Sequence, residues 1–135
     1  MDDGNQRALW VMRILSAIFL LAAGGIHIYE VFTGTGGVLG VMFILNGIAG
    51  IVLAVAMLVL HGRLLQLATV LSLLFLIATL LALILALTVS LFGITQTWDN
   101  PWVLPTVIIE ATGIVVLGIT TALVFRAPVA SQPAQ

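Results

Sequence analysis

The sequence contains no cysteine and no lysine, and it is poor in charge of either sign. The absence of cysteine excludes disulfides, thiolate metal sites and thiol–disulfide chemistry. Charged residues make up only 7% of the 135 residues, and the formal net charge is -1, whereas a typical soluble domain is about 25% charged. Such a chain lacks both the polar shell of a soluble globular domain and the basic surface of a nucleic-acid binder. We therefore expect no nucleic-acid partner.

Apolar residues are what the sequence has in excess. They make up 62% of the chain, and the mean hydropathy is +1.32. A helix needs about 20 apolar residues to cross about 30 Å of hydrocarbon, whereas a membrane barrel strand is only about 10 residues long and alternates in polarity. The long apolar runs predict an all-α protein, a four-helix transmembrane bundle. The predicted spans are residues 14–32, 38–60, 67–94 and 103–125.

Polar breaks separate these runs and set the domain organisation. A glycine-rich turn at 33–37, a short hairpin at 61–63 and a longer loop at 96–102 connect the spans. The expected organisation is a cytoplasmic N-terminal segment (1–13), a transmembrane domain (14–126) and a flexible cytoplasmic tail (127–135).

The four basic residues, all arginine, predict the orientation. They precede the first span, separate the second from the third and follow the fourth: Arg7, Arg13, Arg63 and Arg126. These places fall on one side of the membrane, and the loops of the other side contain no Lys or Arg. The positive-inside rule then predicts that both termini are cytoplasmic, N-in/C-in. Trp98 and Trp102 would lie at the outer interface, as membrane-interface aromatics do.

Small residues predict where the helices meet, because helices in lipid associate through close packing rather than through the hydrophobic effect. Residues 22–25 are Ala-Ala-Gly-Gly, and Gly47 and Gly50 follow in the second span, with Gly113 and Gly118 in the fourth. Ordinary bundle packing accounts for this pattern, and a dedicated dimer motif is the alternative. The third span is rich in leucine, which suits contact with lipid or with a broad partner surface.

Polar groups inside the apolar runs are the candidate functional residues, because charge in hydrocarbon is costly. His27 and Glu30 lie near the end of the first span, Asn46 in the second and Glu110 in the fourth, all in the predicted outer half. The i, i+3 spacing of His27 and Glu30 places them on one helix face. We expect these residues to line an outward-opening polar pocket, with the tryptophans of the 96–102 loop at its rim.

Several interpretations of this pocket are open. In the structural one, His27 hydrogen-bonds Glu110 and Asn46 satisfies the remaining polar groups, while Glu30 reaches the interface. In the functional ones, the pocket recognises a lipid headgroup or small amphiphile, or handles protons or small ions. A metal site made of His27, Glu30 and Glu110 is a weaker candidate, since there is one His and no motif indicates a cofactor. Acid–base catalysis on a lipid-soluble substrate is permitted but not demanded by any motif.

The segment from Arg13 to His27, Arg-Ile-Leu-Ser-Ala-Ile-Phe-Leu-Leu-Ala-Ala-Gly-Gly-Ile-His, resembles the start of the DoxX-like small bacterial membrane proteins. Residues 46–53, Asn-Gly-Ile-Ala-Gly-Ile-Val-Leu, look similar to the same family. The resemblance implies a four-helix bundle in the bacterial inner membrane, and the absence of lysine looks actinobacterial. Where that family commonly has Lys and Glu, this chain has His27 and Asn46.

The sequence thus predicts a small integral membrane protein without a soluble domain. We expect a non-enzymatic accessory subunit, or a binder of lipid or of a small amphiphile. Its partners would be the lipid bilayer and a membrane protein or a second copy of the chain. The alternatives are a small ion- or proton-handling transporter and a membrane enzyme, each using His27 and Glu110.

Overall fold

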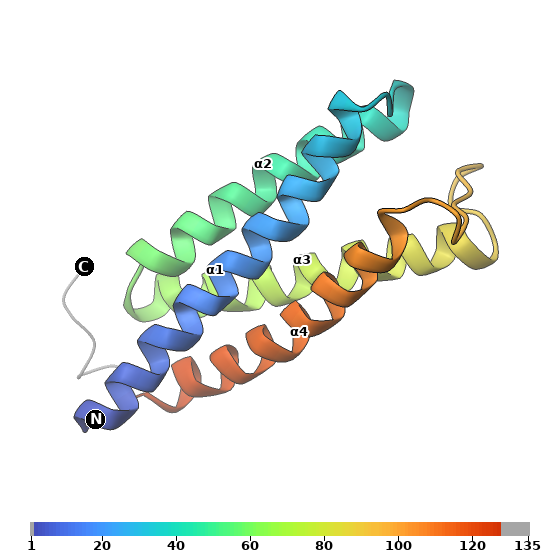
Figure 1. Ribbon diagram of the computed structural model, residues 1–135. Coiled ribbons are helices and arrows are strands. Elements are labelled where there is room, and N and C mark those ends of the chain that lie inside the picture. Colours follow the sequence, from blue (N-terminus) through green and yellow to red (C-terminus); the bar gives the residue numbers. More distant parts are fainter. Residues whose placement is uncertain (1, 128–135) are drawn as a thin grey trace.

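The computed structural model describes residues 2–127, and these form four helices without a strand (Figure 1). The helices are α1 (Asp3–Phe32), α2 (Gly37–Val59), α3 (Gly62–Thr88) and α4 (Val103–Arg126). All four are long and apolar enough to cross a membrane. The predicted all-α four-helix architecture is confirmed, and the chain is a multi-pass helical membrane protein. Beyond Ala127, the predicted flexible tail lies outside the described residues.

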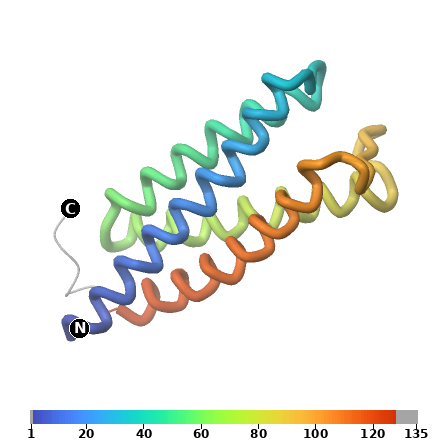
Figure 2. Tube along the Cα trace, viewed as in Figure 1, coloured from blue at the N-terminus to red at the C-terminus, as the bar shows by residue number. Residues whose placement is uncertain are grey.

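The helices run up and down, so that the bundle has two different ends. The start of α1, the turn at 60–61 and the end of α4 share one end, here called the arginine end because the four arginines lie in or near it. The connections 33–36 and 89–102 share the other, here called the loop end. Helix α1 packs against α2 and α4, α3 packs against α4, and α2 and α3 make the smallest contact among these neighbouring pairs. In Figure 2 the α1–α2 hairpin diverges from α3 and α4 toward the loop end.

Helix α1 begins at Asp3, well before the apolar run that starts at residue 14. The reason is an N-cap, because the Asp2 side chain accepts a hydrogen bond from the backbone N–H of Asn5 at 2.8 Å. The carboxylate of Asp3, in the first turn, also interacts favourably with the positive end of the helix dipole. The segment expected to precede the bundle therefore continues its first helix.

Helix α3 ends at Thr88, although the apolar run continues to residue 94. Ser90, Phe92 and Gly93 adopt left-handed backbone angles, with φ of 73°, 51° and 81°. These values are incompatible with a continuing right-handed helix. The apolar residues that follow Thr88 belong to the 89–102 connection rather than to a longer span.

Three glycines bring α1 and α2 into backbone contact. A Cβ atom added to Gly24 would lie 3.2 Å from the carbonyl oxygen of Gly47, and one added to Gly50 would lie 2.8 Å from that of Leu20. The small residues predicted to mediate helix packing do so at these positions. Gly25, in contrast, has no atom of a neighbouring element within 4 Å of such a Cβ, so its small size is not used in this contact.

Arg13 joins α1 to the end of α2. It is only 5% exposed, and its guanidinium donates to the carbonyl oxygens of Met57 at 2.7 Å, Leu58 at 3.1 Å and Leu60 at 2.8 Å. These carbonyls belong to the last turn of α2, which has no intrahelical donors left to satisfy them. The Arg13 guanidinium also lies 5.0 Å from the ring centre of Trp10. Arg13, which the sequence marks only as an orientation signal, therefore caps the C-terminal end of α2 with its side chain.

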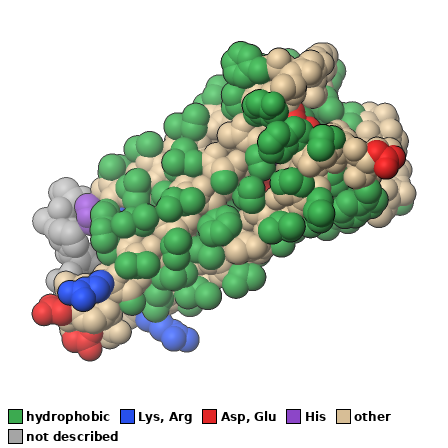
Figure 3. All heavy atoms as spheres, in the orientation of Figure 1, with side chains coloured by type: hydrophobic (Ala, Val, Ile, Leu, Met, Phe, Trp, Pro, Cys, Tyr) green, Lys and Arg blue, Asp and Glu red, His purple; other side chains and the backbone are tan. Residues whose placement is uncertain are grey.

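The packed core occupies the middle of the bundle and its arginine end. Its fully buried large apolar side chains are Leu20, Met57, Leu76, Leu117 and Val124. A hydrogen bond between the hydroxyls of Ser16 and Thr120, at 2.9 Å, joins α1 to α4 in the same region. On the face shown in Figure 3, hydrophobic side chains cover the bundle and the arginine side chains gather at one end. This distribution suits a surface in contact with lipid.

Candidate functional site

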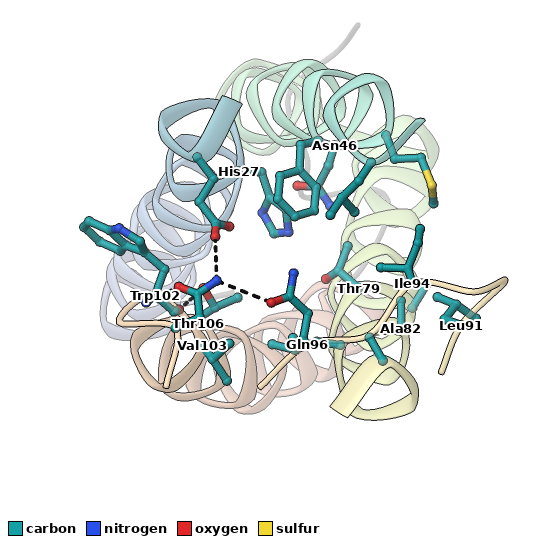
Figure 4. Close-up of a pocket in the computed structure, with 18 of the residues that line it drawn as sticks. His27, Asn46, Thr79, Ala82, Leu91, Ile94, Gln96, Trp102, Val103 and Thr106 are labelled. Atoms are coloured by element: carbon teal, nitrogen blue, oxygen red, sulfur yellow. Dashed lines mark hydrogen bonds between the residues drawn. The ribbon is translucent and has the colours of Figure 1, made fainter. Parts of the chain in front are cut away.

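A cavity of about 250 Å³ lies at the loop end, bounded by all four helices and by the 89–102 connection (Figure 4). Its walls are mainly apolar, with alanine and leucine from α3 and aromatic rings from α2 and α3. The polar lining includes His27, Glu30, Asn46, Thr79, Gln96 and Asn100. Apolar walls with a few polar groups are typical of sites for small molecules.

His27 projects from α1 into the cavity (Figure 4). Its Nδ1 lies 2.7 Å from the carbonyl oxygen of Ala23, and since a carbonyl can only accept, Nδ1 is the donor. In the neutral ring, Nε2 is therefore the acceptor. The ring also meets Phe43 edge to face, with centroids 4.7 Å apart. The predicted hydrogen bond between His27 and Glu110 is not formed, so that prediction is wrong.

Glu30 is part of a small network that ties the 89–102 connection to α1. Asn100 Nδ2 donates to Glu30 Oε1 and to Gln96 Oε1, each at 3.3 Å (Figure 4). Asn100 Oδ1 accepts from the backbone N–H of Trp102 at 2.9 Å, and the N–H of Gln96 donates to the carbonyl of Ala86 at 2.9 Å. The connection is thereby held over the end of the cavity. The carboxylate of Glu30, expected to reach the interface alone, is held at the cavity by a loop residue.

Asn46 and the two tryptophans differ in how they meet the cavity. Asn46 lines it from α2, and its Oδ1 is buried without a hydrogen-bond partner. Trp102 lines it and packs edge to face with Tyr29, at a centroid distance of 5.0 Å. Trp98 is 63% exposed and is not among the described lining residues. Of the two expected rim residues, Trp102 alone reaches the cavity.

Glu110 lies inside the bundle but outside the cavity lining. It is 0% exposed, and neither of its carboxyl oxygens has a hydrogen-bond partner among the described residues. Thr79 lies beside it, yet the Thr79 hydroxyl donates to the carbonyl of Leu76 at 3.0 Å. An ionised carboxylate buried without a partner costs several kcal/mol, so the protonated acid is the form that this position accommodates. Neither His27 nor Asn46 holds Glu110, so of the two expected states, a protonated acid or a carboxylate held by one of these residues, the second is not formed.

Gly113, close to Glu110 along α4, leaves no open space in the bundle. A Cβ atom on Gly113 would lie 2.7 Å from Leu76 Cδ1 and 3.2 Å from Phe19 Cβ, so other helices fill the gap that the glycine leaves. Across residues 2–127, no three His, Cys, Asp or Glu side chains come together as a metal would require. The ligand set of His27, Glu30 and Glu110 is therefore not assembled in this part of the chain.

Sequence reasoning missed the polar residues that complete the lining. Thr79 lies on α3 and its hydroxyl donates to the carbonyl of Leu76. Thr106 was not missed, since it lies on the α4 face expected to point inward, and its hydroxyl donates to the carbonyl of Trp102. Gln96 and Asn100 lie in the connection, where the sequence shows only a polar break. The Asn100-Pro101 pair just before α4 is the one signal that marks Asn100 as a residue with a structural role.

Searches against protein-family models, curated proteins and solved structures found no match to this chain. The resemblance to DoxX-like proteins therefore stays a prediction, and the cavity is the feature from which function is inferred.

Proposed function

We propose that the protein binds a small amphiphile, an apolar molecule with one polar group, in the cavity at the loop end, and that it does so without catalysis. The observation that carries this proposal is the cavity itself, of about 250 Å³, with mainly apolar walls and polar side chains from α1, α2 and the 89–102 connection. An apolar body would contact the walls while its polar group meets these side chains.

The small side chains of the cavity walls support the proposal. The walls contain Ala78, Ala82 and Ala86 on successive turns of α3, where larger side chains would close the space. An occupant recovers the packing that these small residues forgo.

The position of the packed core disfavours transport. Between the cavity and the arginine end lie fully buried apolar side chains, among them Leu20, Leu76 and Leu117. An ion or proton crossing the bundle needs water or a chain of polar groups. The buried polar groups of this layer, such as Glu110 and the Ser16–Thr120 pair, have no hydrogen bond to the cavity lining among the described residues. Catalysis is also disfavoured, because in residues 2–127 the His27 ring has no hydrogen bond to a carboxylate that would orient it as a base.

The arginine distribution supports an orientation for the site. Arg7, Arg63 and Arg126 lie at the arginine end, and the loop end has no basic residue among the described positions. We infer that both termini are cytoplasmic in a bacterial inner membrane, which places the cavity in the outer half of the bilayer. The outward leucines of α3 would face lipid or a protein partner equally well, so an accessory-subunit role is the second possibility.

A cavity-filling variant tests the proposal. Ala82→Phe places a ring in the cavity, whereas Ala111→Phe adds the same ring on an exposed face of α4. We expect 1-octanol to raise the thermal unfolding midpoint of the wild-type protein and of Ala111→Phe in detergent, but not that of Ala82→Phe. Mass spectrometry of the purified protein should find a co-purified amphiphile in the same two forms. Equal responses of all three proteins would contradict the proposal.

A further inference from the structure

The charges near the cavity are all of one sign. Glu30 lies on the lining and Asp99 is exposed in the connection that covers it, whereas Glu110, buried one turn below Thr106, is accommodated as the neutral acid and adds no charge. The described lining residues include no Lys or Arg. Along α1, the nearest arginine, Arg13, is about 21 Å from His27 at 1.5 Å per residue. A charged ligand group in this cavity therefore meets a negative side chain without a compensating cation.

Three hydrogen-bond acceptors on the lining are free to meet a ligand. Glu30 uses Oε1 toward Asn100, which leaves its second oxygen free. The Oδ1 of Asn46 is buried without a partner, and Nε2 of His27 is an acceptor in the neutral ring.

Several donors on the lining are already engaged. The hydroxyls of Thr79 and Thr106 donate to backbone carbonyls, and the Asn100 amide donates to two side chains. The side-chain amides of Asn46 and Gln96 and the indole N–H of Trp102 remain as neutral donors. A ligand that brings donors or a positive charge satisfies this lining better than an anion does.

Aromatic rings complete the surroundings. Phe43, Phe75 and Trp102 line the cavity, and the faces of such rings attract an ammonium group within about 6 Å. An alkylammonium head combines a positive charge with an apolar surface, so it can lie among rings and still face a carboxylate. An anionic head would need basic donors that the described lining does not contain.

We infer that the amphiphile is a cation, an apolar body with an ammonium group that lies against Glu30 and the aromatic rings. This inference rests on the proposed binding function and specifies its ligand class. It assigns Glu30 the role of counterion and leaves the apolar body to the walls formed by α2 and α3.

Three probes of nearly the same shape test the charge preference on the full-length protein in a neutral detergent. They are benzyltrimethylammonium, its uncharged counterpart neopentylbenzene and the anion benzylsulfonate. We expect the cation to bind about tenfold more tightly than the neutral probe. This is the effect of the attraction between two opposite charges about 6 Å apart at an effective dielectric constant of about 40. The anion should bind most weakly. Calorimetric titration measures all three dissociation constants.

A pair of matched variants assigns the preference to one residue. Glu30→Gln keeps the shape and an oxygen for Asn100 while removing the charge, so it should weaken binding of the cation about tenfold and leave the neutral probe unchanged. Asp99→Asn removes an exposed carboxylate of the same end that does not line the cavity, and it should change neither constant.

The outcomes separate the two proposals. Equal binding of the three wild-type probes, or an equal loss in Asp99→Asn and Glu30→Gln, overturns the cation inference. In that case, the proposed binding function still holds if octanol binds the wild-type protein and Ala82→Phe abolishes this binding. If none of the probes binds while octanol does, the cation inference again fails alone. If octanol and all three probes fail to bind, the proposed function fails as well. The wild-type comparison decides even where Glu30→Gln does not fold.

Discussion

The contact between α1 and α2 makes one substitution especially informative. In Gly50→Ala, the new Cβ would lie 2.8 Å from the carbonyl oxygen of Leu20 and 3.3 Å from the Cα of Gly24. Both are backbone atoms, so no rotamer change can relieve the overlap, and the two helices must separate by a few tenths of an ångström. Overpacking of this kind costs about 1–3 kcal/mol. We expect Gly50→Ala to destabilise the bundle by that amount.

Gly25→Ala is the matched control. It makes the same chemical change in the middle of a helix, but no atom of another element lies within 4 Å of the new Cβ. Alanine has a helix propensity better than that of glycine by about 0.5–1 kcal/mol. We therefore expect Gly25→Ala to leave stability unchanged or to raise it slightly. The two variants should differ in the sign of their effect on the free energy of unfolding.

Unfolding in mixed detergent micelles measures this difference. The helical circular dichroism signal is followed as the fraction of a denaturing detergent increases, and the midpoints of the two variants are compared with wild type. Tryptophan emission provides a second signal and tests two-state behaviour. If Gly50→Ala matches wild type, or if Gly25→Ala is destabilised as much as Gly50→Ala, then the close approach of α1 and α2 at these glycines is not what stabilises the hairpin.

Three further predictions concern the arginine end, the orientation and the buried acid. Arg13→Met leaves the last carbonyls of α2 without their donors and should lower the free energy of unfolding by about 2–4 kcal/mol, whereas Arg7→Met, at an exposed position, should change it by less than about 0.5 kcal/mol. Cysteine in place of Gly36 should react with an impermeant maleimide on intact cells and cysteine in place of Asn5 should not; the reverse pattern would contradict the orientation. Glu110→Gln should keep the unfolding midpoint near that of wild type, while a loss of roughly 3–5 kcal/mol would show that an ionised carboxylate stabilises the bundle.

The architecture could be predicted from the sequence because lipid leaves so few alternatives. Each backbone polar group must be satisfied within its own segment, so long apolar runs become helices and short polar breaks become connections. The helix ends were less predictable. Composition shows where hydrophobicity stops, but α1 begins at the cap formed by Asp2, and α3 ends where Ser90 and Phe92 turn left-handed. Neither the cap nor the left-handed turn is visible in the hydropathy of the sequence.

The candidate site was also predictable only in part. Counting the rise per residue predicts depth, and His27, Glu30 and Asn46, predicted at the same end, do lie on one cavity. The count does not show how far the packed core extends toward the loop end. Glu110 was placed at a depth similar to that of His27, yet it lies beneath the lining, among packed side chains. Asn100 reaches the cavity because the 89–102 connection folds back over it, and helical periodicity cannot predict the path of a loop.

The uneven distribution of contacts between the helices explains why the cavity lies where it does. At the arginine end, the guanidinium of Arg13 closes α2 onto α1, and the hydroxyls of Ser16 and Thr120 join α1 to α4. At the loop end, the described side-chain links between α1 and the 89–102 connection are the 3.3 Å hydrogen bond from Asn100 to Glu30 and the edge-to-face contact of Trp102 with Tyr29. A neutral donor at that distance contributes little compared with a capped helix end. The cavity is therefore bounded on one side by the packed core and on the other by a connection with few side-chain links to α1. The residue that holds this connection, Glu30, is also the carboxylate that a cationic ligand would contact, so the ligand and the Asn100 amide would share one carboxylate, with Asn100 at Oε1 and the ligand at the oxygen that Asn100 leaves free.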